Sequence, residues 1–420
     1  MALAPTPCII AEYNPFHNGH RYHLDQAREV TGADYCIVVM SGNFTQRGEP
    51  ALMDKYFRTR MALENGADLV LELPVSSACA SASGFADGAV TLLHRLGVVD
   101  FLVFGSECGD VSLLKEAASI LAAEPADYKK MLKNLLRAGQ SYPAARSAAL
   151  LSYLQEETVN SRLYLEHPTS ISTLLSSPNN ILGIEYCKSL SGCNSSTEPV
   201  TIRRSGGQYL DSDLSGGDKS SALAIRNACL RDGFPGNIRP YVPENVYDLM
   251  KREYGKTFPV VPETLSQMLH YKLLTEAENG FSGYLDITPD LSDRIRKYIP
   301  EYQGFTSFCQ LLKSKDMTYT RISRCLLHIL LQIPADTPVA ASYAKILGFR
   351  TDATPLLTAI KANTAVPLIS KLADADRLLD EAALEQLKKD VLSTRIYHAL
   401  VLQACGTRLP DETRTPIVRI

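Results

Sequence analysis

Short apolar runs alternate with amphipathic stretches along the first half of the chain. Five of these runs have the length and the continuous apolar character of buried parallel strands: 8–11, 34–40, 68–73, 101–104 and 200–203. The stretches between them, such as 54–64 and 83–96, place apolar residues at helical spacing. Strands separated by helices of this length indicate parallel β-α-β units, and the run at 200–203 is expected to be the last strand of the sheet.

The pattern changes twice along the chain. An Ala-, Leu- and Lys-rich region at about 111–158 reads as a helical insertion, followed by a helix over 181–190. Beyond a Gly- and Pro-rich segment at 232–236, the pattern is mostly helical to about residue 400. We therefore expect an α/β fold, with a Rossmann-like parallel-sheet domain at 1–235, which carries the insertion, and a mostly helical domain at 236–420.

Composition narrows the class of protein without pointing to a function. Of 420 residues, 45% are hydrophobic and 21% are charged, which is typical of a globular protein. The ten cysteines include no C-x-x-C pair, so neither a disulfide framework nor a zinc site is indicated. The net charge of −3 excludes a surface that is basic all over and binds nucleic acid, but it does not exclude a local basic patch. No apolar run reaches membrane length and no cleavable signal is apparent, so we expect a cytoplasmic protein without a membrane partner.

The strongest candidate for a functional site is the segment at 8–24, which reads CIIAEYNPFHNGHRYHL. The first strand is broken by Asn14-Pro15, and a helical pattern follows from about 17–20 to about Val30. A helix that begins at the carboxyl end of a strand presents free backbone N–H groups and a positive dipole end, which suit a phosphate. His17 and His20 are three residues apart and share one face of the first turn, while Gly19 lets a ligand approach the backbone.

The His-x-Gly-His arrangement resembles the signature of the nucleotidyltransferase superfamily, which includes class I aminoacyl-tRNA synthetases. This resemblance implies that His17 and His20 hold ATP phosphates and stabilise charge at the α-phosphorus, and that both are catalytic. The competing interpretation is a pair of histidines that only cap and solvate a helix turn. The order of strand, proline break and glycine favours the nucleotide site.

Further motifs follow in order along the chain: EYNPFHNGH, SGNFTQRGEPA, GADLVLELP, FGSE, SPNNILGIEY, TIRR and SALAIR, and the segment 319–331 extends the likeness into the C-terminal half. With them, the chain resembles the bacterial tRNA-Met cytidine acetate ligase family. The resemblance implies ATP-dependent activation of acetate to acetyl-adenylate. The acetyl group would then pass to the exocyclic amine of the wobble cytidine of elongator tRNA-Met, which gives N4-acetylcytidine. The partners implied are acetate and this tRNA.

The same resemblance implies a set of ATP contacts. They are Ile10, Ala11, Glu12, Tyr13, Asn14, Pro15, Phe16, His17, Asn18, Gly19, His20, Arg21, Tyr22, His23, Gly105, Asn179, Arg204 and Ser205. The chemistry is suitable, because Gly105 allows close approach, Asn179 offers a donor and an acceptor, and Arg204 can pair with phosphate. The alternatives are a helix cap for Asn179 and a solvated sheet edge for Arg204.

A second superfamily signature, a Ser- or Thr-rich helix start that ends in Ile-Arg, aligns with 221–226. Ser221 and Arg226 are therefore candidate phosphate contacts, although Ala222 and Leu223 stand where small polar residues are usual. The alternative is a capped helix with a surface arginine. Lys55 and Arg47 are further candidates for phosphate or RNA, or else exposed charges. No carboxylate cluster indicates a metal site, so Mg²⁺ is expected only as an ion that arrives bound to the ATP phosphates.

We expect the helical domain at 236–420, and not the nucleotide-binding domain alone, to hold the tRNA, with the insertion at about 111–158 as the alternative. Three basic clusters are the candidates: Lys129, Lys130, Lys133 and Arg137; Arg294, Arg296 and Lys297; and Lys313, Lys315, Arg321 and Arg324. Tyrosines near the last two offer faces for stacking of an unpaired base, and we single out Arg296 and Arg321 as contacts. Ordinary solvated helix faces are the competing interpretation. Two other functions stay open at this point. One is an adenylyltransferase or synthetase acting on a small metabolite, and the other is a nucleotide-regulated RNA-binding protein without turnover.

Overall fold

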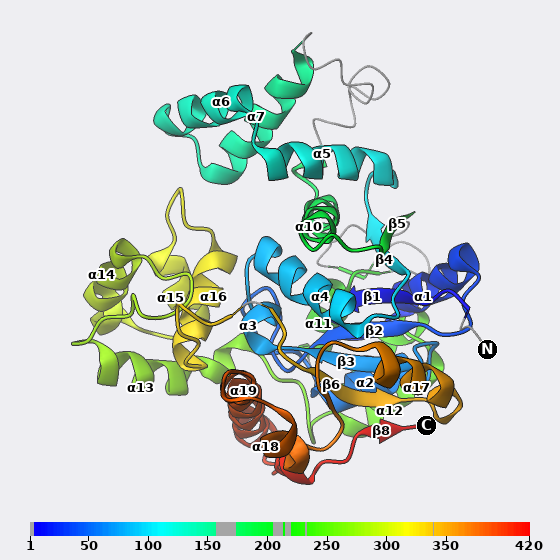
Figure 1. Ribbon diagram of the computed structural model, residues 1–420. Helices are drawn as coiled ribbons and strands as arrows, with labels where there is room; N and C mark the ends of the chain where they lie inside the picture. The colour runs from blue at the N-terminus through cyan, green and yellow to red at the C-terminus, as the bar shows by residue number, and fades with distance from the viewer. Residues whose placement is uncertain (1–3, 157–173, 205–212, 215–219, 232, 339) are drawn as a thin grey trace.

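The computed structural model describes residues 4–156, 174–204, 213–214, 220–231, 233–338 and 340–420 (Figure 1). An eight-stranded sheet runs through its centre in the order β5-β4-β1-β2-β3-β6-β7, with β8 paired to β6. The strands are β1 (Pro7–Ala11), β2 (Ile37–Ser41), β3 (Leu69–Leu73), β4 (Phe101–Ser106), β5 (Glu198–Arg203), β6 (Ala344–Phe349), β7 (Leu368–Ile369) and β8 (Val418–Arg419). The first five strands are mutually parallel, as the alternation of runs and helices predicts.

Helices cover both faces of the sheet. The described helices of the first half are α1 (Asn18–Thr31), α2 (Lys55–Leu63), α3 (Val75–Ala78), α4 (Ala82–Leu96), α5 (Val111–Ala123), α6 (Ala126–Arg137), α7 (Tyr142–Gln155), α10 (Pro178–Gly192) and α11 (Ala222–Cys229). Helices α4, α5 and α10 pack on one face, and α1, α2 and α11 pack on the other (Figure 1). The apolar strands are buried between these two layers, which is why their sequences are continuously hydrophobic. The predicted fold class, a Rossmann-like sheet with a helical region, is confirmed.

The second half of the chain is mostly helical, and part of it has an apolar core of its own, while other helices pack against the sheet. Its elements are α12 (Glu244–Glu253), α13 (Ser266–Glu276), α14 (Pro289–Tyr298), α15 (Phe305–Leu312), α16 (Tyr319–Leu330), α17 (Thr354–Asn363), α18 (Ala375–Leu378) and α19 (Glu381–Cys405), with short 3₁₀ turns between them. Helices α13 to α16 bury one apolar cluster together with part of α19. Lys315 connects this unit to the insertion, because its Nζ donates to the carbonyl of Gly139 at 2.5 Å.

The expectation that 200–203 is the last strand of the sheet is wrong. Three later strands join the sheet, and β6 pairs with β3 in antiparallel orientation, with Glu72 opposite Lys345. β5 instead forms the opposite edge, next to β4. The physical reason lies in β3, which is buried along its whole length and so needs a neighbour on each side. The sheet therefore crosses residue 235, and the division of the chain into two domains there stays a prediction.

Lys55 is neither an exposed charge nor in reach of phosphate or RNA, contrary to both predictions for it. It is fully buried, and its Nζ lies 2.7 Å from Glu72 Oε1 and also pairs with Glu412. Lys345 Nζ lies 2.8 Å from Glu72 Oε2 and 2.6 Å from Glu412 Oε1. We call Lys55, Glu72, Lys345 and Glu412 the buried ion cluster. It fastens the C-terminal strand β6 and the C-terminal 3₁₀ turn to β3 and α2.

The lysines and glutamates of the buried ion cluster keep one another charged. Burial opposes the charge of Lys345, but Glu72 and Glu412 raise its pKa well above the ordinary value. Burial likewise opposes the charge of Glu412, while Lys55 and Lys345 hold its pKa below the ordinary value. Each charge therefore depends on the opposite charges beside it.

No helix in the described part of the chain is both long and apolar enough to cross a membrane.

Candidate active site

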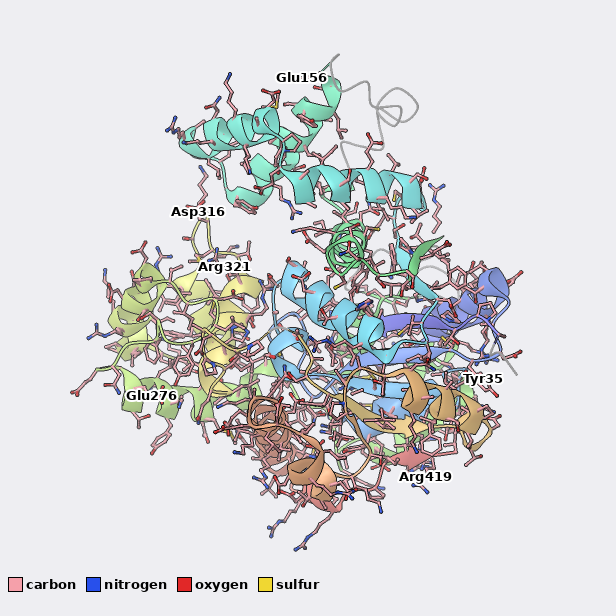
Figure 2. All side chains as sticks on the ribbon, viewed as in Figure 1. Tyr35, Glu156, Glu276, Asp316, Arg321 and Arg419 are labelled. Atoms are coloured by element: carbon pink, nitrogen blue, oxygen red, sulfur yellow. The ribbon has the colours of Figure 1, made fainter. Side chains whose placement is uncertain are left out.

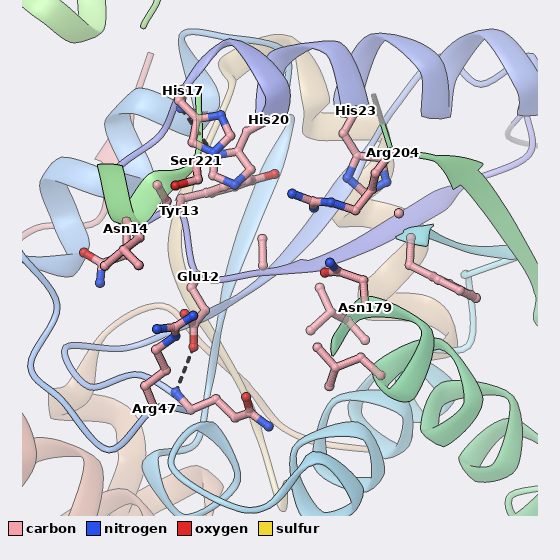
Figure 3. Close-up of a pocket in the computed structure, with 18 of the residues that line it drawn as sticks. Glu12, Tyr13, Asn14, His17, His20, His23, Arg47, Asn179, Arg204 and Ser221 are labelled. Carbon is pink, nitrogen blue, oxygen red and sulfur yellow. Dashed lines mark hydrogen bonds between the residues drawn. The ribbon is translucent and has the colours of Figure 1, made fainter. Parts of the chain in front are cut away.

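A cleft opens at the carboxyl ends of β1 and β4, where the strand order reverses. The chain runs outward from β1 to β2 and β3, then returns to place β4 and β5 on the other side of β1. Such a switch point is where open α/β sheets bind ligands. The cleft holds about 1100 Å³ of empty space, which includes open solvent at its mouth. Figure 3 shows side chains from α1, α10, α11 and the strand ends converging on it.

The loop after β1 is fixed by two guanidinium groups. Arg58, fully buried on α2, donates to the backbone carbonyls of Glu12 at 2.6 Å, Ser41 at 3.2 Å and Met53 at 3.0 Å. Arg226, on α11, donates to the carbonyl of Asn14 at 2.7 Å. The carbonyls of Glu12 and Asn14 lie beyond the end of β1, so these bonds anchor the loop to α2 and α11.

His17 and His20 close the N-terminus of α1. His17 Nδ1 accepts a hydrogen bond from the backbone N–H of Gly19 at 3.1 Å, and His20 Nδ1 accepts one from the N–H of His17 at 3.3 Å. Their rings stack with centroids 3.7 Å apart. Because both Nδ1 atoms accept, the proton of each neutral imidazole is on Nε2. The structure thus unites the two predictions for this pair: the histidines cap the helix and also line the cleft.

Burial keeps these histidines neutral. It lowers the pKa of His17 to about 3, and the nearby Arg204 and Arg226 contribute further. Burial lowers the pKa of His20 as well, with help from His17 and Arg204. His23 lies one turn later, where burial and Arg204 lower its pKa to about 4, and its Nε2 is buried without a hydrogen-bond partner. At neutral pH the loop therefore offers N–H donors, while the positive charge comes from the arginines.

The opposite wall of the cleft comes from β4, β5 and α10. A side chain at Gly105 would place its Cβ 3.2 Å from Arg204 Cγ, so the backbone is open here because residue 105 is glycine. Asn179 Nδ2 donates to Glu107 Oε1 at 2.7 Å, and the backbone N–H of Asn180 donates to Glu107 Oε2 at 2.8 Å. Glu107 thus caps α10 and orients Asn179 toward the cleft. Its FGSE motif is a signal in the sequence, but its capping role was not predicted.

Ser221 and Arg226 bring a second helix N-terminus to the cleft. Ser221 Oγ accepts from the backbone N–H of Ala224 at 3.0 Å, so the predicted cap of α11 is present. Ala222 and Leu223, which depart from the superfamily pattern, also line the cleft. Two helix N-termini, those of α1 and α11, therefore meet at one site, an arrangement that favours a polyanion.

Comparisons with known proteins agree with this geometry. The family model described as HIGH Nucleotidyl Transferase matches residues 6–411. The tRNA(Met) cytidine acetate ligase of Halothermothrix orenii is 39% identical over 426 residues, which cover 99% of each chain. That of Clostridium perfringens (strain SM101) is 40% identical over 93% of this chain and 94% of its own. This chain belongs to the tRNA(Met) cytidine acetate ligase family.

Solved structures of the ligase family have the same fold. Thermotoga maritima TmcAL in its apo form I superposes with a TM-score of 0.90, at 32% identity and with 99% of both chains covered. The same protein bound with alpha-thio ATP, in form II, gives a TM-score of 0.87 at the same identity and coverage. The sequence-based identification of the family is thereby confirmed.

Most of the contacts expected from the ligase family lie on this cleft. They are Ile10, Ala11, Glu12, Tyr13, Asn14, His17, His20, His23, Gly105, Asn179, Arg204, Ser221 and Arg226, together with the candidate Arg47. Gly19 and Tyr22 line an adjoining hollow beside Arg204. Ser205 lies outside the described residues. Four lining side chains had no signal beyond hydrophobicity, because apolar walls and core residues look alike in sequence: Phe85, Phe104, Leu182 and Tyr186.

The remaining residues of the first loop have other surroundings. Phe16 is fully buried and packs edge-on against Tyr13, with ring centroids 4.9 Å apart. Pro15 is buried, and Arg21 is exposed. Asn18 Nδ2 donates to the carbonyl of Pro240 at 2.9 Å. These four side chains are not among those that line the cleft.

Proposed function

We propose that this protein joins acetate to ATP as acetyl-adenylate and transfers the acetyl group to the exocyclic amine of the wobble cytidine of elongator tRNA-Met. The observation that supports it most is the neutral His17–His20 pair at a helix N-terminus, in a chain that matches named tRNA(Met) cytidine acetate ligases almost end to end. ATP and tRNA as substrates place the proposed activity in the cytoplasm.

The cleft fits the phosphates of ATP. His17 and His20 would donate from Nε2–H, and Arg204 and Arg226 would supply positive charge. An acetate oxygen would attack the α-phosphorus, and pyrophosphate would leave. No protein nucleophile is needed, so the contribution of the chain is positioning and stabilisation of developing charge. Mg²⁺ would arrive bound to the ATP phosphates.

Arg204→Ala should weaken ATP binding more than tRNA binding. Its side chain lines the cleft next to the histidines and lowers their pKa values, so it lies within their electrostatic reach. Loss of a charge-assisted phosphate contact costs roughly 1.5–3 kcal/mol, or about tenfold to a hundredfold in affinity. Separate titrations of ATP and tRNA against the variant decide the point. A selective loss of tRNA affinity would instead assign Arg204 to the RNA surface.

We also propose that the helical half and the insertion hold the tRNA. Lys129, Lys130, Lys133 and Arg137 are exposed on α6, and Lys315 contacts Gly139 at the α6–α7 turn. Figure 2 places Arg321 close to the loop at Asp316, on the side that faces the insertion. Arg324 is not part of this surface, because its Nη1 donates to the carbonyl of Gln46 at 3.4 Å and supports the cleft loop.

Charge reversals test the RNA surface. Arg296→Glu and Arg321→Glu should weaken tRNA binding uniformly and lower the salt dependence of binding by about one ion each, because each phosphate contact releases counterions. Arg296 is exposed on α14 and its nearest acid, Asp293, is 3.7 Å away, so the change should not unfold the helix. Arg377→Glu, also exposed and paired within its own turn, is the matched control. Equal tRNA affinity in all three variants would place the RNA surface elsewhere.

The proposal as a whole is tested by incubation with ATP, labelled acetate and total tRNA. Label recovered as acetylcytidine in tRNA supports it. Label found only in a small product would favour a metabolite adenylyltransferase or synthetase. ATP-dependent tRNA binding without any labelled product would favour an RNA-binding protein without turnover.

A further inference from the structure

Among the described residues that line the cleft, Glu12 has the one carboxylate. It follows β1 directly and is half-buried. In Figure 3 it lies between the histidine pair and Arg47. Its position is unusual for a site that binds a polyanion, since the other titratable side chains of the wall are histidines, arginines and two tyrosines.

The Glu12 side chain is held in place. Its Oε1 accepts the backbone N–H of Gln46 at 2.8 Å, and its own carbonyl accepts Arg58 Nη1 at 2.6 Å. Both bonds come from elements on the β2–β3 side of the switch point. The histidines, Gly105 and Arg204 lie on the α1, β4 and β5 side. Glu12 is thus at the boundary between the phosphate half of the cleft and the half that remains for the second substrate.

Electrostatics disfavours a role for this carboxylate on ATP itself. A carboxylate about 4 Å from a phosphate costs on the order of 1 kcal/mol per charge pair in water, and about 4 kcal/mol at the effective dielectric of a protein surface. Acylation of an amine, in contrast, releases a proton that must be accepted near the reacting nitrogen. The histidines are poor acceptors, because their Nδ1 atoms are occupied by backbone donors and burial disfavours their charged form.

We propose that Glu12 is the general base of the acetyl-transfer step and marks the subsite for the cytosine amine; this rests on the proposed function. The amine nitrogen forms a bond to the acetyl carbonyl carbon, and the bond from that carbon to the phosphate oxygen breaks. AMP leaves with the electron pair on its phosphate oxygen. One proton of the amine passes to a Glu12 carboxylate oxygen and from there to water.

Glu12→Gln tests this assignment with little structural change, because a glutamine oxygen can still accept the N–H of Gln46. Single-turnover acetylation of tRNA should fall by about 10²-fold or more, and by at least about tenfold more than acetate-dependent exchange of pyrophosphate into ATP. Acetylation of hydroxylamine, a strong nucleophile that needs no base, should fall no further than pyrophosphate exchange does. Glu49→Gln, on the loop after β2 that carries Gln46 and outside the cleft lining, is the matched control.

The outcomes separate the two proposals. Near-normal tRNA acetylation by Glu12→Gln overturns the base. A parallel loss of pyrophosphate exchange, tRNA acetylation and hydroxylamine acetylation also overturns it, because Glu12 would then serve ATP or the loop. Failure of the wild-type protein to exchange pyrophosphate in the presence of acetate would instead contradict the proposed function, whatever the variant does.

Discussion

Replacement of His17 or His20 by asparagine should reduce acetate-dependent pyrophosphate exchange by about a hundredfold or more. Each variant removes one Nε2–H group that we propose to donate to the ATP phosphates, and loss of a single such donor in other enzymes costs roughly 3 kcal/mol of transition-state stabilisation. The effect should appear in kcat rather than in KM, because the donor acts on charge that develops during the reaction. Steady-state exchange at saturating ATP and acetate measures it.

Asparagine is chosen at position 17 because its side-chain oxygen can still cap α1. His17→Ala would add about 1 kcal/mol of lost capping to any catalytic effect, so the comparison of the two variants separates structure from chemistry. His94→Asn, an exposed histidine on α4, is the matched control. Near-wild-type exchange by both His17→Asn and His20→Asn would remove the active site from this loop.

Lys55→Met should destabilise the protein by about 3–5 kcal/mol, the usual cost of leaving buried charge without its partner. Lys55 Nζ bonds both Glu72 oxygens, at 2.7 and 2.9 Å, and the hydroxyl of Thr394 at 2.9 Å. Removal of the ammonium leaves two buried carboxylates opposite Lys345 alone. Urea unfolding at neutral pH, analysed for the free energy of unfolding, gives the loss.

Two further variants interpret that result. Lys361→Met removes an exposed lysine and should change the free energy of unfolding by no more than about 0.5 kcal/mol. Addition of Glu72→Gln to Lys55→Met removes one of the stranded charges and should recover part of the loss. A loss below about 1 kcal/mol in Lys55→Met would show that the buried ion cluster does not fasten β6 to β3.

Local pattern was sufficient to predict the parallel half of the sheet. Its strands are buried on both faces, so each one appears as a continuous apolar run, and caps such as Asp54 and Ser221 mark the helix starts between them. The cleft was also predictable, because parallel strands end at one edge, where His17 and His20 follow β1 and Gly105 lies near the end of β4. Motif order supplied the remaining wall residues Asn179, Arg204 and Arg226.

Long-range pairing explains what the sequence did not reveal. The short run AKILGF of β6 stands among helical segments, and nothing local tells that it pairs with β3, which is more than 270 residues away. Lys55 and Arg58 look like surface charges of a helix, because the acids and carbonyls that justify their burial come from distant segments. Glu12 was predicted as an ATP contact, and only the geometry of the cleft separates it from the phosphate donors.

The central claim is that acetate attacks the α-phosphorus of ATP in this cleft, and oxygen transfer from acetate tests it most directly. Acetate labelled with ¹⁸O at both oxygens would be incubated with the protein, ATP and tRNA, and the released AMP would be analysed by mass spectrometry. Attack on the α-phosphorus leaves one acetate oxygen on the phosphate when the acetyl group departs. We predict AMP that carries one ¹⁸O, in an amount equal to the acetylcytidine formed. Acetylated tRNA accompanied by unlabelled AMP, or by ADP, would contradict the account.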